Sequence, residues 1–440
     1  MNKKIVLVGA GSTSFGPSTL TDLFHSDLLE GSTVVLHDIN KKNLKIIYEL
    51  VSAENDNLNN KLQIDYTTNR SKAFENADFI ISSIEVGERL KLWRQDYQIP
   101  RMFGSSQILG ECGGPGGTLH AFRIIPQVVD IVKDVEKICP KAFFINFSNP
   151  MARVCLAIKR VAPSLNFVGL CHEVAGMESH LVQMFKKKLK NLKLIVGGLN
   201  HFAFLLGLED LTTGKNLMPE FNLRVMDHFK VNEHRFDFSL LTFEIYKRFG
   251  WFCYGGDNHV GEYLQFAEEF TKTQDMIDWI DRTEREGKRI YREIIKYYKK
   301  LMDENFPKKG IYRKVSSGER AIPIIESIIE DKNSHESAVN IPNHGIIENL
   351  PQDLVIECSA TINKSGAHGI KLGRIPKSIA AILRIEATIQ DLCVEAVLKN
   401  SKELAITCLA IDPNVGSFNM AENIFSKMVE LQKDYLPKFK

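Results

Sequence analysis

Short, continuous apolar runs alternate with stretches of helical spacing along the first 150 residues of the chain. The apolar runs are at residues 5–8, 34–36, 63–66, 77–83 and 143–147. Between them, residues 17–24 and 41–60 have apolar positions spaced as in an amphipathic helix. A strand covered on both faces shows such an uninterrupted run, and strands that alternate with helices form parallel sheets. The pattern therefore predicts an α/β fold that begins with a Rossmann-type, doubly wound parallel sheet.

After about residue 170 the pattern changes to shorter β segments, at 194–208 and 353–363, and to long, charged helical stretches. The helical stretches cover roughly residues 264–302 and 376–411. A chain of 440 residues exceeds one compact hydrophobic core. We therefore expect two packed domains, a Rossmann-type domain at 1–170 and an α+β domain at 171–440 that carries much of the substrate pocket. The polar stretch 303–320 is predicted to be a mobile loop.

Composition and charge narrow the class of protein further. The formal net charge is +2, which gives no electrostatic basis for binding nucleic acid or an anionic membrane. No segment has the roughly 20 consecutive apolar residues that span a bilayer. The eight cysteines are scattered without paired spacing, which argues against a disulfide framework. We therefore expect a cytoplasmic protein with reduced cysteines.

The turn after the first predicted strand carries the chemistry of a dinucleotide site. Gly9 and Gly11 allow a tight turn and a close approach of the backbone to a pyrophosphate, which the following helix N-terminus attracts. Ser12 comes next, and the third glycine of the usual pattern is missing because position 14 is serine. The second strand ends at Asp38, whose carboxylate can bind both ribose hydroxyls and repel a 2′-phosphate. The unit predicts NAD in preference to NADP, and an ordinary turn without a ligand is the alternative.

Three further segments lie where predicted strands end. Residues 110–117 are so rich in glycine that we expect a tightly packed loop. Residues 169–174 and 197–202 each follow a short apolar strand, and they place Cys171 and His201 at the sheet edge where doubly wound folds bind ligands. A thiolate and an imidazole there suit a divalent metal with open coordination positions. Their separation is too long for a local metal motif, and each residue by itself is more typical of a buried core position than of a metal ligand.

Several segments, in order along the chain, resemble glycoside hydrolase family 4. They are Ile-Val-Leu-Val-Gly-Ala-Gly-Ser (5–12), Gly-Glu-Cys-Gly-Gly-Pro-Gly-Gly (110–117), Asn-Phe-Ser-Asn-Pro-Met (146–151), Cys-His-Glu-Val (171–174), Asn-His-Phe (200–202) and Gly-Asp-Asn-His-Val-Gly-Glu-Tyr (256–263). The resemblance implies a fold like that of lactate and malate dehydrogenases and a hydrolysis that depends on NAD and Mn²⁺. In this family NAD⁺ takes a hydride from C3 of the sugar and a base removes the acidified C2 proton. The glycosidic group then leaves C1, water adds, and the hydride returns.

The resemblance also implies roles for single residues. The metal-binding cysteine and histidine of the family match Cys171 and His201, and the expected ion is Mn²⁺. The residue after the cysteine, which assists departure of the leaving group in α-specific members, is His172. Tyr263 matches the tyrosine described as the C2 base, and Asp257 is the rival base. A phenol with an ordinary pKa of about 10 must be lowered to act in this way, as a nearby metal could do.

The remaining candidates concern the sugar. Glu111 matches an acidic residue that assists the base, Asn149 a ligand of a substrate hydroxyl, and Arg94 a substrate-binding arginine. Three of the assignments from the resemblance have an alternative without a role in catalysis. Glu111 could be a charge on a loop surface, Arg94 a cation on a helix surface, and Tyr263 a packed aromatic residue. Cys-His-Glu-Val resembles the α-galacturonidase branch, and a uronate needs a cationic partner. Candidates for that partner are three arginines on one predicted helix, Arg282, Arg285 and Arg289.

Together these expectations describe an NAD- and Mn²⁺-dependent α-glycosidase that acts on a uronic acid glycoside, with an α-galacturonide of pectin fragments as the leading substrate. Within the family, α-glucuronidase and α-galactosidase activities are the alternatives. From other classes, a 2-hydroxy-acid dehydrogenase would share the dinucleotide fingerprint, and an NAD-sensing binding protein would lack turnover. We expect a small sugar as the partner, no nucleic acid or membrane, and a homodimer or homotetramer, which the long amphipathic helices would allow.

Overall fold

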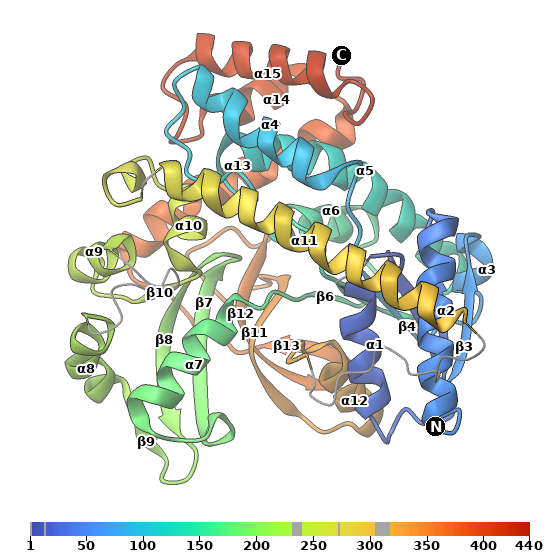
Figure 1. Ribbon diagram of the computed structural model, residues 1–440. Helices are drawn as coiled ribbons and strands as arrows, with labels where there is room; N and C mark the ends of the chain where they lie inside the picture. Colours follow the sequence, from blue (N-terminus) through green and yellow to red (C-terminus); the bar gives the residue numbers. More distant parts are fainter. Residues whose placement is uncertain (1, 13–14, 231–239, 272, 304–316) are drawn as a thin grey trace.

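The described residues of the computed structural model are 2–12, 15–230, 240–271, 273–303 and 317–440 (Figure 1). They form one thirteen-stranded mixed sheet. The strand order is β10-β8-β7-β12-β11-β6-β5-β4-β1-β2-β3, with β13 beside β12 and β9 beside β8. A single sheet therefore connects the two halves of the chain.

One half of this sheet is parallel. It consists of β1 (Lys4–Val8), β2 (Thr33–His37), β3 (Gln63–Thr67), β4 (Phe79–Ser82), β5 (Phe143–Asn146) and β6 (Phe167–Gly169), paired in the order 3-2-1-4-5-6. The connecting helices are α1 (Phe15–His25), α2 (Lys41–Asn57), α3 (Arg70–Phe74), α4 (Arg89–Met102), α5 (Gly114–Ile138) and α6 (Met151–Val161). Every residue of β4 and β5 is buried, as is all of β1 after its first residue. The continuous apolar runs thus mark strands covered on both faces, and the Rossmann-type prediction is confirmed.

The second half of the chain extends the sheet with antiparallel strands. These are β7 (Leu192–Leu199), β8 (Phe202–Asp210), β9 (Lys215–Asn216), β10 (Cys253–Tyr254), β11 (Ser334–Pro342), β12 (Val355–Asn363) and β13 (Gly366–Gly369). The junction lies at the pair Asn340 and Gly169, where β11 meets β6. One hydrophobic core contains both Ile5 of β1 and Met428 near the C-terminus. The division into domains 1–170 and 171–440 stays a prediction, because sheet and core are continuous across it.

The helices of the second half of the chain pack both on the antiparallel strands and on helices of the parallel half. They are α7 (Glu173–Phe185), α8 (Met218–Lys230), α9 (Leu240–Phe249), α10 (Gly256–Val260), α11 (Thr273–Leu301), α12 (Ala321–Glu330), α13 (Lys377–Lys399), α14 (Lys402–Ala410) and α15 (Phe418–Gln432). Short 3₁₀ turns lie at Leu189–Asn191, Gly261–Tyr263 and Ala267–Glu269. In Figure 1 the yellow α11 runs diagonally across the molecule, and it contacts both α2 and α4. The helices α13, α14 and α15 pack on α4, α5 and α6.

Some boundaries differ from the predicted ones. The stretch 376–411 is two helices, because Asn400 adopts φ 52° and the Ser401 hydroxyl accepts the Leu404 N–H to begin a new helix. The stretch 264–302 becomes an α-helix only at Thr273. Most of the predicted loop 303–320, namely 304–316, lies outside the described residues. All eight cysteines are free, as predicted. In the part of the chain described, no helix is long and apolar enough to cross a membrane.

The glycine-rich segment 110–117 is only partly a loop, so the prediction of a loop throughout was wrong. The helix α5 begins at Gly114, and its first turn ends at Gly117. A Cβ atom at Gly116 would lie 2.6 Å from the Asp96 carbonyl oxygen, and one at Gly117 would lie 2.4 Å from the carbonyl carbon of Cys112. The glycines let a helix start pack directly on neighbouring backbone. That packing outweighs the helix propensity that glycine lacks, about 1 kcal/mol per residue.

Candidate active site

A cavity of about 1630 Å³ opens at the carboxyl ends of the parallel strands. Its walls include Gly9 and Gly11 after β1, Asp38 after β2 and Asn149 after β5. Helix α11 contributes Trp279 to another wall. The strand order reverses between β1 and β4, and ligands of doubly wound sheets bind at such a point.

The turn between β1 and α1 is shaped for a close ligand. Gly9 has φ 87°, and a Cβ atom there would lie 2.0 Å from the Ser83 carbonyl oxygen. The Gly11 N–H donates to Oδ2 of Asp38 at 2.9 Å, and the Asn40 N–H donates to Oδ1 at 2.7 Å. These bonds hold the Asp38 carboxylate on the cavity wall. The open backbone and the fixed carboxylate fit the pyrophosphate and the ribose of a dinucleotide.

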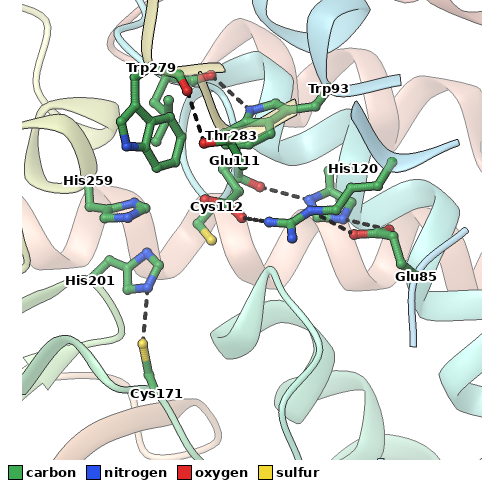
Figure 2. Close-up of polar contacts among 12 residues, drawn as sticks. Glu85, Trp93, Glu111, Cys112, His120, Cys171, His201, His259, Trp279 and Thr283 are labelled. Atoms are coloured by element: carbon green, nitrogen blue, oxygen red, sulfur yellow. Dashed lines mark hydrogen bonds and ion pairs between the residues drawn. The ribbon is translucent and has the colours of Figure 1, made fainter. Parts of the chain in front are cut away.

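Cys171 and His201 lie side by side, although thirty residues separate them in the sequence. Sγ of Cys171 is 3.2 Å from Nε2 of His201 (Figure 2). Cys171 follows β6, and His201 lies in the two-residue turn between β7 and β8 with φ 61°. A non-glycine residue in this region is strained, and such strain gathers at functional sites. Nδ1 of His201 is buried and has no hydrogen-bond partner among the described residues.

The surroundings of this pair determine its charge. Burial and the carboxylates of Glu173 and Glu357 raise the pKa of the Cys171 thiol well above its usual value. Hydrogen bonds from the Glu173 backbone and the Asn200 side chain lower the same pKa. Burial lowers the pKa of His201 well below its usual value, so the imidazole is neutral. A neutral imidazole beside a thiol that can lose its proton on coordination fits a divalent metal.

Two more side chains, which the sequence did not assign to the metal, lie next to this pair. The ring centroid of His259 is 4.2 Å from that of His201. Nε2 of His259 is 3.7 Å from Oε1 of Glu173. One donor atom from each of Glu173, His201 and His259 lies within 4.8 Å of the other two. Glu173 and His259 belong to two of the segments that resemble glycoside hydrolase family 4, 171–174 and 256–263. Only the folding of the chain brings these two segments together.

Glu262 anchors the glycine-rich segment. Its buried carboxylate accepts the N–H groups of Glu111 at 2.6 Å, Cys112 at 3.0 Å and Gly113 at 2.9 Å. One donor atom from each of Cys112, His201 and Glu262 also lies within 4.8 Å of the others. Because the Glu262 oxygens already accept three backbone hydrogen bonds at the start of α5, we interpret this carboxylate as an anchor of the segment.

Glu111 belongs to a charged network on the cavity side of this anchor. Arg89 donates to Oε1 of Glu111 at 2.6 Å, and Nδ1 of His120 is 2.9 Å from the Glu111 carbonyl oxygen. Nε2 of His120 is 3.2 Å from Oε1 of Glu85 (Figure 2). Burial opposes ionisation of Glu85, but His120 and Arg89 outweigh it and lower the pKa of Glu85 to about 2. The Glu111 side chain is therefore buried and ion-paired, and Arg89 and Glu85 line the cavity.

The two candidate bases have different surroundings. The Tyr263 ring stacks on Phe202 with centroids 5.4 Å apart, and its hydroxyl donates to the Asn200 carbonyl oxygen at 3.3 Å. Burial raises the pKa of Tyr263 well above its usual value. The two oxygens of Asp257 accept two backbone N–H groups at the start of α9, at 2.9 and 3.0 Å. Both roles stay predictions, and these hydrogen bonds give Asp257 a structural task as well.

The sugar-binding candidates are spread along the cavity. Arg94 lines it but forms ion pairs with Asp281 and Glu284 of α11. Asn149 lines it too, and its Oδ1 atom is buried without a partner in the described part of the chain. The His172 side chain, at the N-terminus of α7, is 77% exposed. Asn149 thus has an acceptor ready for a ligand, whereas Arg94 already has two protein partners.

Comparisons with known proteins agree with this geometry. The family model described as family 4 glycosyl hydrolase matches residues 4–187, and the model of the family's C-terminal domain matches residues 196–415. An α-glucosidase of Erwinia rhapontici is 34% identical over 99% of each chain. An α-galacturonidase of Thermoanaerobacter italicus is 27% identical over 98% of this chain and 97% of its own.

Solved structures show the same fold. A 6-phospho-α-glucosidase from gut microorganisms, solved in complex with NAD and Mn²⁺, has a TM-score of 0.84 at 22% identity over the full length of both chains. A lactate dehydrogenase from Eimeria maxima has a TM-score of 0.52 at 13% identity, over 90% of this chain and 96% of its own. The predicted similarity to the lactate dehydrogenase fold is therefore confirmed.

Proposed function

The chain belongs to family 4 of the glycosyl hydrolases, and from this membership we propose that it hydrolyses α-glycosides with the help of NAD⁺ and Mn²⁺. The observation that carries the proposal is the pairing of Cys171 with His201 in a molecule that also has a dinucleotide-binding turn. We call this turn, with Gly9, Gly11 and Asp38 on the cavity wall, the dinucleotide cradle. A 2-hydroxy-acid dehydrogenase shares the dinucleotide site but does not need a metal. A metal held by Cys171 and His201 in the same molecule is the addition that suits cleavage of a sugar through a ketone and an enolate.

Bound NAD⁺ would exchange a hydride with a sugar carbon, and bound Mn²⁺ would stabilise negative charge on the sugar oxygens. The residues of the chain bind and orient the cofactor, the ion and the sugar. Gly9 and Asp38 hold the dinucleotide, while Cys171 and His201 hold the ion. A sugar hydroxyl donates to the Asn149 Oδ1 atom, because that buried acceptor has no other partner among the described residues. The unpaired Oδ1 thereby selects one orientation of the sugar.

We assign proton transfer from the sugar C2 atom to the Tyr263 side-chain oxygen, which must first lose its own proton in order to accept this one. Stacking on Phe202 and the hydrogen bond to Asn200 hold the phenol in one position. Burial alone keeps it protonated, and a cation at Cys171 and His201 would lower its pKa. His172, which is 77% exposed, has room to donate a proton to the departing oxygen.

A neutral α-glucoside is our first candidate substrate. Four of the cations on the cavity wall are already ion-paired, which removes them as partners of a sugar carboxylate. These pairs are Arg70 with Asp134, Arg89 with Glu111, Arg94 with Asp281 and Glu284, and Lys288 with Glu284. The similarity to the 34% identical α-glucosidase points the same way.

An α-galacturonide, the substrate expected from Cys-His-Glu-Val, is the second candidate, and Arg282 favours it. Of the three arginines on α11, only Arg282 is found on the cavity wall within the described residues. Arg289 pairs instead with Glu286 and Glu293 on the exposed face of the helix. Arg282 is thus the residue that would hold a uronate.

The test is a panel of p-nitrophenyl α-glucoside, α-galacturonide, α-glucuronide and α-galactoside with NAD⁺, Mn²⁺ and a thiol. We expect the fastest release of nitrophenol from the α-glucoside, and a preference for the α-galacturonide would favour the second candidate. Turnover in D₂O should place deuterium at C2 of the released sugar. Net formation of NADH would instead indicate a dehydrogenase, and no turnover on any glycoside would indicate a binding protein.

A further inference from the structure

The Glu85 carboxylate lies on the cavity wall next to the turn that carries Asn149. Glu85 follows β4 and Asn149 follows β5, and these two strands are parallel neighbours in the sheet. Their turns are joined, because the Ile84 N–H donates to Oγ of Ser148 at 2.9 Å and the Ser148 hydroxyl donates to the Ile84 carbonyl oxygen at 3.0 Å. Two hydrogen-bond acceptors, the Glu85 carboxylate and Oδ1 of Asn149, thus lie on adjoining turns of the cavity wall.

The buried His120 of α5 holds this carboxylate in one position and keeps it ionised. Oε1 of Glu85 accepts the Val86 N–H at 3.0 Å and lies 3.2 Å from Nε2 of His120. Nδ1 of His120 is 2.9 Å from the Glu111 carbonyl oxygen (Figure 2). Both ring nitrogens therefore face oxygen acceptors, which suits a protonated imidazole. Although burial opposes both charges, Glu85 raises the pKa of His120, and His120 lowers the pKa of Glu85 to about 2.

The other oxygen of Glu85 keeps acceptor capacity for a ligand. Oε2 is 3.6 Å from Nε of Arg89, which is longer than a hydrogen bond. The short contact of Arg89 goes instead to Glu111, at 2.6 Å. The Glu85 side chain is 29% exposed, and an ionised carboxylate has about four acceptor positions and no donor. Oε2 can therefore accept a hydroxyl group of a ligand in the cavity.

The charges around Glu85 leave no surplus positive charge for an anion. Glu85 and Glu111 carry one negative charge each. Arg89 and His120 carry the two positive charges that balance them. A carboxylate or phosphate group of a sugar has no proton to donate to Oε2, and its charge repels that of Glu85 at close range. A sugar hydroxyl, in contrast, can donate to Oε2 of Glu85 or to Oδ1 of Asn149. The wall formed by these two turns therefore matches an uncharged sugar.

We propose that Glu85 is a specificity-determining residue, which binds a hydroxyl group of an uncharged sugar and disfavours sugars that carry a carboxylate or a phosphate. The inference rests on the proposed function above and deepens it, because it assigns the preference for a neutral glycoside to one side chain. Arg282, which also lines the cavity, is the residue that would act in the opposite direction. Loss of the Glu85 charge should therefore change which sugar is preferred.

The experiment compares two substrates that differ only at C6, p-nitrophenyl α-glucoside and p-nitrophenyl α-glucuronide. The measured quantity is the ratio of their kcat/KM values, glucoside over glucuronide, at saturating NAD⁺ and Mn²⁺. Glu85→Gln should lower this ratio at least about tenfold, because the amide removes the charge and adds a donor for a carboxylate. Since both substrates are measured in the same variant, weaker cofactor binding or partial misfolding cancels from the ratio.

Two further variants complete the design. Glu75→Gln is the matched control, because Glu75 is an exposed carboxylate just before β4 and lies outside the cavity wall. Its ratio should stay within about twofold of that of the unchanged protein. Glu85→Asp keeps the charge but withdraws the acceptor, so it should lower kcat/KM for the glucoside at least about tenfold without raising that for the glucuronide. Should Glu85→Gln turn over neither substrate, Glu85→Asp decides, and an unchanged kcat/KM for the glucoside would overturn the inference.

The outcomes separate this inference from the proposed function. If the unchanged protein cleaves glycosides but Glu85→Gln leaves the ratio within about twofold, only the inference fails. It also fails if the unchanged protein prefers the glucuronide. Loss of NAD⁺ affinity in Glu85→Gln with an unchanged ratio would assign Glu85 to the cofactor instead. If only galactosides are cleaved, the α-galactoside and α-galacturonide, which again differ at C6, form the test pair. If none of the four glycosides is cleaved, the proposed function fails and the inference fails with it.

Discussion

Several side chains in this molecule combine a structural and a chemical task. The Asp38 carboxylate accepts the N–H groups of Gly11 and Asn40, and it also faces the cavity where a ribose would bind. Asp257 holds the start of α9 through both carboxylate oxygens. A substitution at such a residue must therefore be tested for folding and for function separately.

Asp38→Ala should weaken NAD⁺ binding by about tenfold or more and leave Mn²⁺ affinity unchanged. The variant loses the acceptor of the ribose hydroxyls, and a charged hydrogen bond is worth about 1.5–3 kcal/mol. Isothermal titration of both ligands measures the effect. Asp65→Ala is the control, because Asp65 lies on the neighbouring strand β3 and outside the cavity wall. Equal NAD⁺ affinity in Asp38→Ala and the unchanged protein would contradict the cradle assignment.

Tyr263→Phe should lower kcat by about 10²- to 10⁴-fold, the range for loss of a general base. The melting temperature should change little, since phenylalanine keeps the stacking on Phe202 and the lost hydrogen bond is a long one at 3.3 Å. Steady-state kinetics and loss of the C2 hydrogen to solvent deuterium are the measurements.

Asp257→Asn is the companion variant, and it should act mainly on stability. Its amide nitrogen cannot accept a hydrogen bond, so α9 loses at least one of the three bonds that the Leu241 N–H, the Thr242 N–H and the Thr242 hydroxyl donate to this side chain, at a cost of about 1–3 kcal/mol. A kcat loss in Asp257→Asn that exceeds the loss in Tyr263→Phe would make Asp257 the base.

At the scale of elements, the start of α5 shows packing prevailing over local propensity. Four consecutive helical positions include three glycines, Gly114, Gly116 and Gly117, which a helix does not favour. Their missing side chains allow the first turn to lie against the segment that carries Glu111 and Cys112. The position of that segment therefore depends on this contact.

Gly116→Ala should destabilise the protein by about 1–3 kcal/mol, because the new methyl group would meet the Asp96 carbonyl oxygen at 2.6 Å. Gly287→Ala in α11 should instead stabilise it by about 0.5–1 kcal/mol, since a Cβ atom there has open space within 4 Å. Urea denaturation gives both values. Changes of the same sign at the two positions would show that helix propensity, and not contact, governs the start of α5.

At the scale of the whole molecule, buried charges connect the C-terminal helices to the parallel half. Arg153 of α6 and Glu386 of α13 form a buried pair at 3.1 Å. Asp412, between α14 and α15, is 2% exposed, and its Oδ2 atom has no hydrogen-bond partner among the described residues. Stability therefore depends on the protonation of groups that do not line the cavity.

Burial raises the pKa of Asp412 to about 6 from an ordinary 3.8. The folded protein thus binds more protons than the unfolded chain between about pH 4 and 6, so the free energy of unfolding falls as pH rises through this range. Asp412→Asn cannot ionise and should lack this fall, which makes it more stable than the unchanged protein by about 2–3 kcal/mol above pH 6. Urea denaturation from pH 4 to 8 measures this, with the exposed Asp65→Asn as the control. Parallel curves of unfolding free energy against pH for Asp412→Asn and the unchanged protein would contradict the prediction.

The parallel half of the fold was predictable because its signals are local. A buried strand shows its apolar run, and the turn that follows shows its glycines, within a few residues of sequence. The position of Asp38 could be predicted as well, because it stands at the end of the next predicted strand. The segments of the active site were also predictable one by one, from their likeness to a known family. The helical start of α5 was missed because propensity is a local quantity and the contact that overrules it is not.

Only the tertiary structure decided which of these segments meet. Cys171 approaches His201 because β6, β11, β12 and β7 are consecutive neighbours in the sheet, and the β7–β8 turn ends beside the start of α7. Glu173 approaches His259 across a gap of 86 positions in the chain, and no spacing rule spans such a gap. The sequence alone therefore determined the dinucleotide half and the donor types. Strand pairing and burial decided their convergence, because distances between side chains far apart in a chain depend on how the whole sheet is ordered.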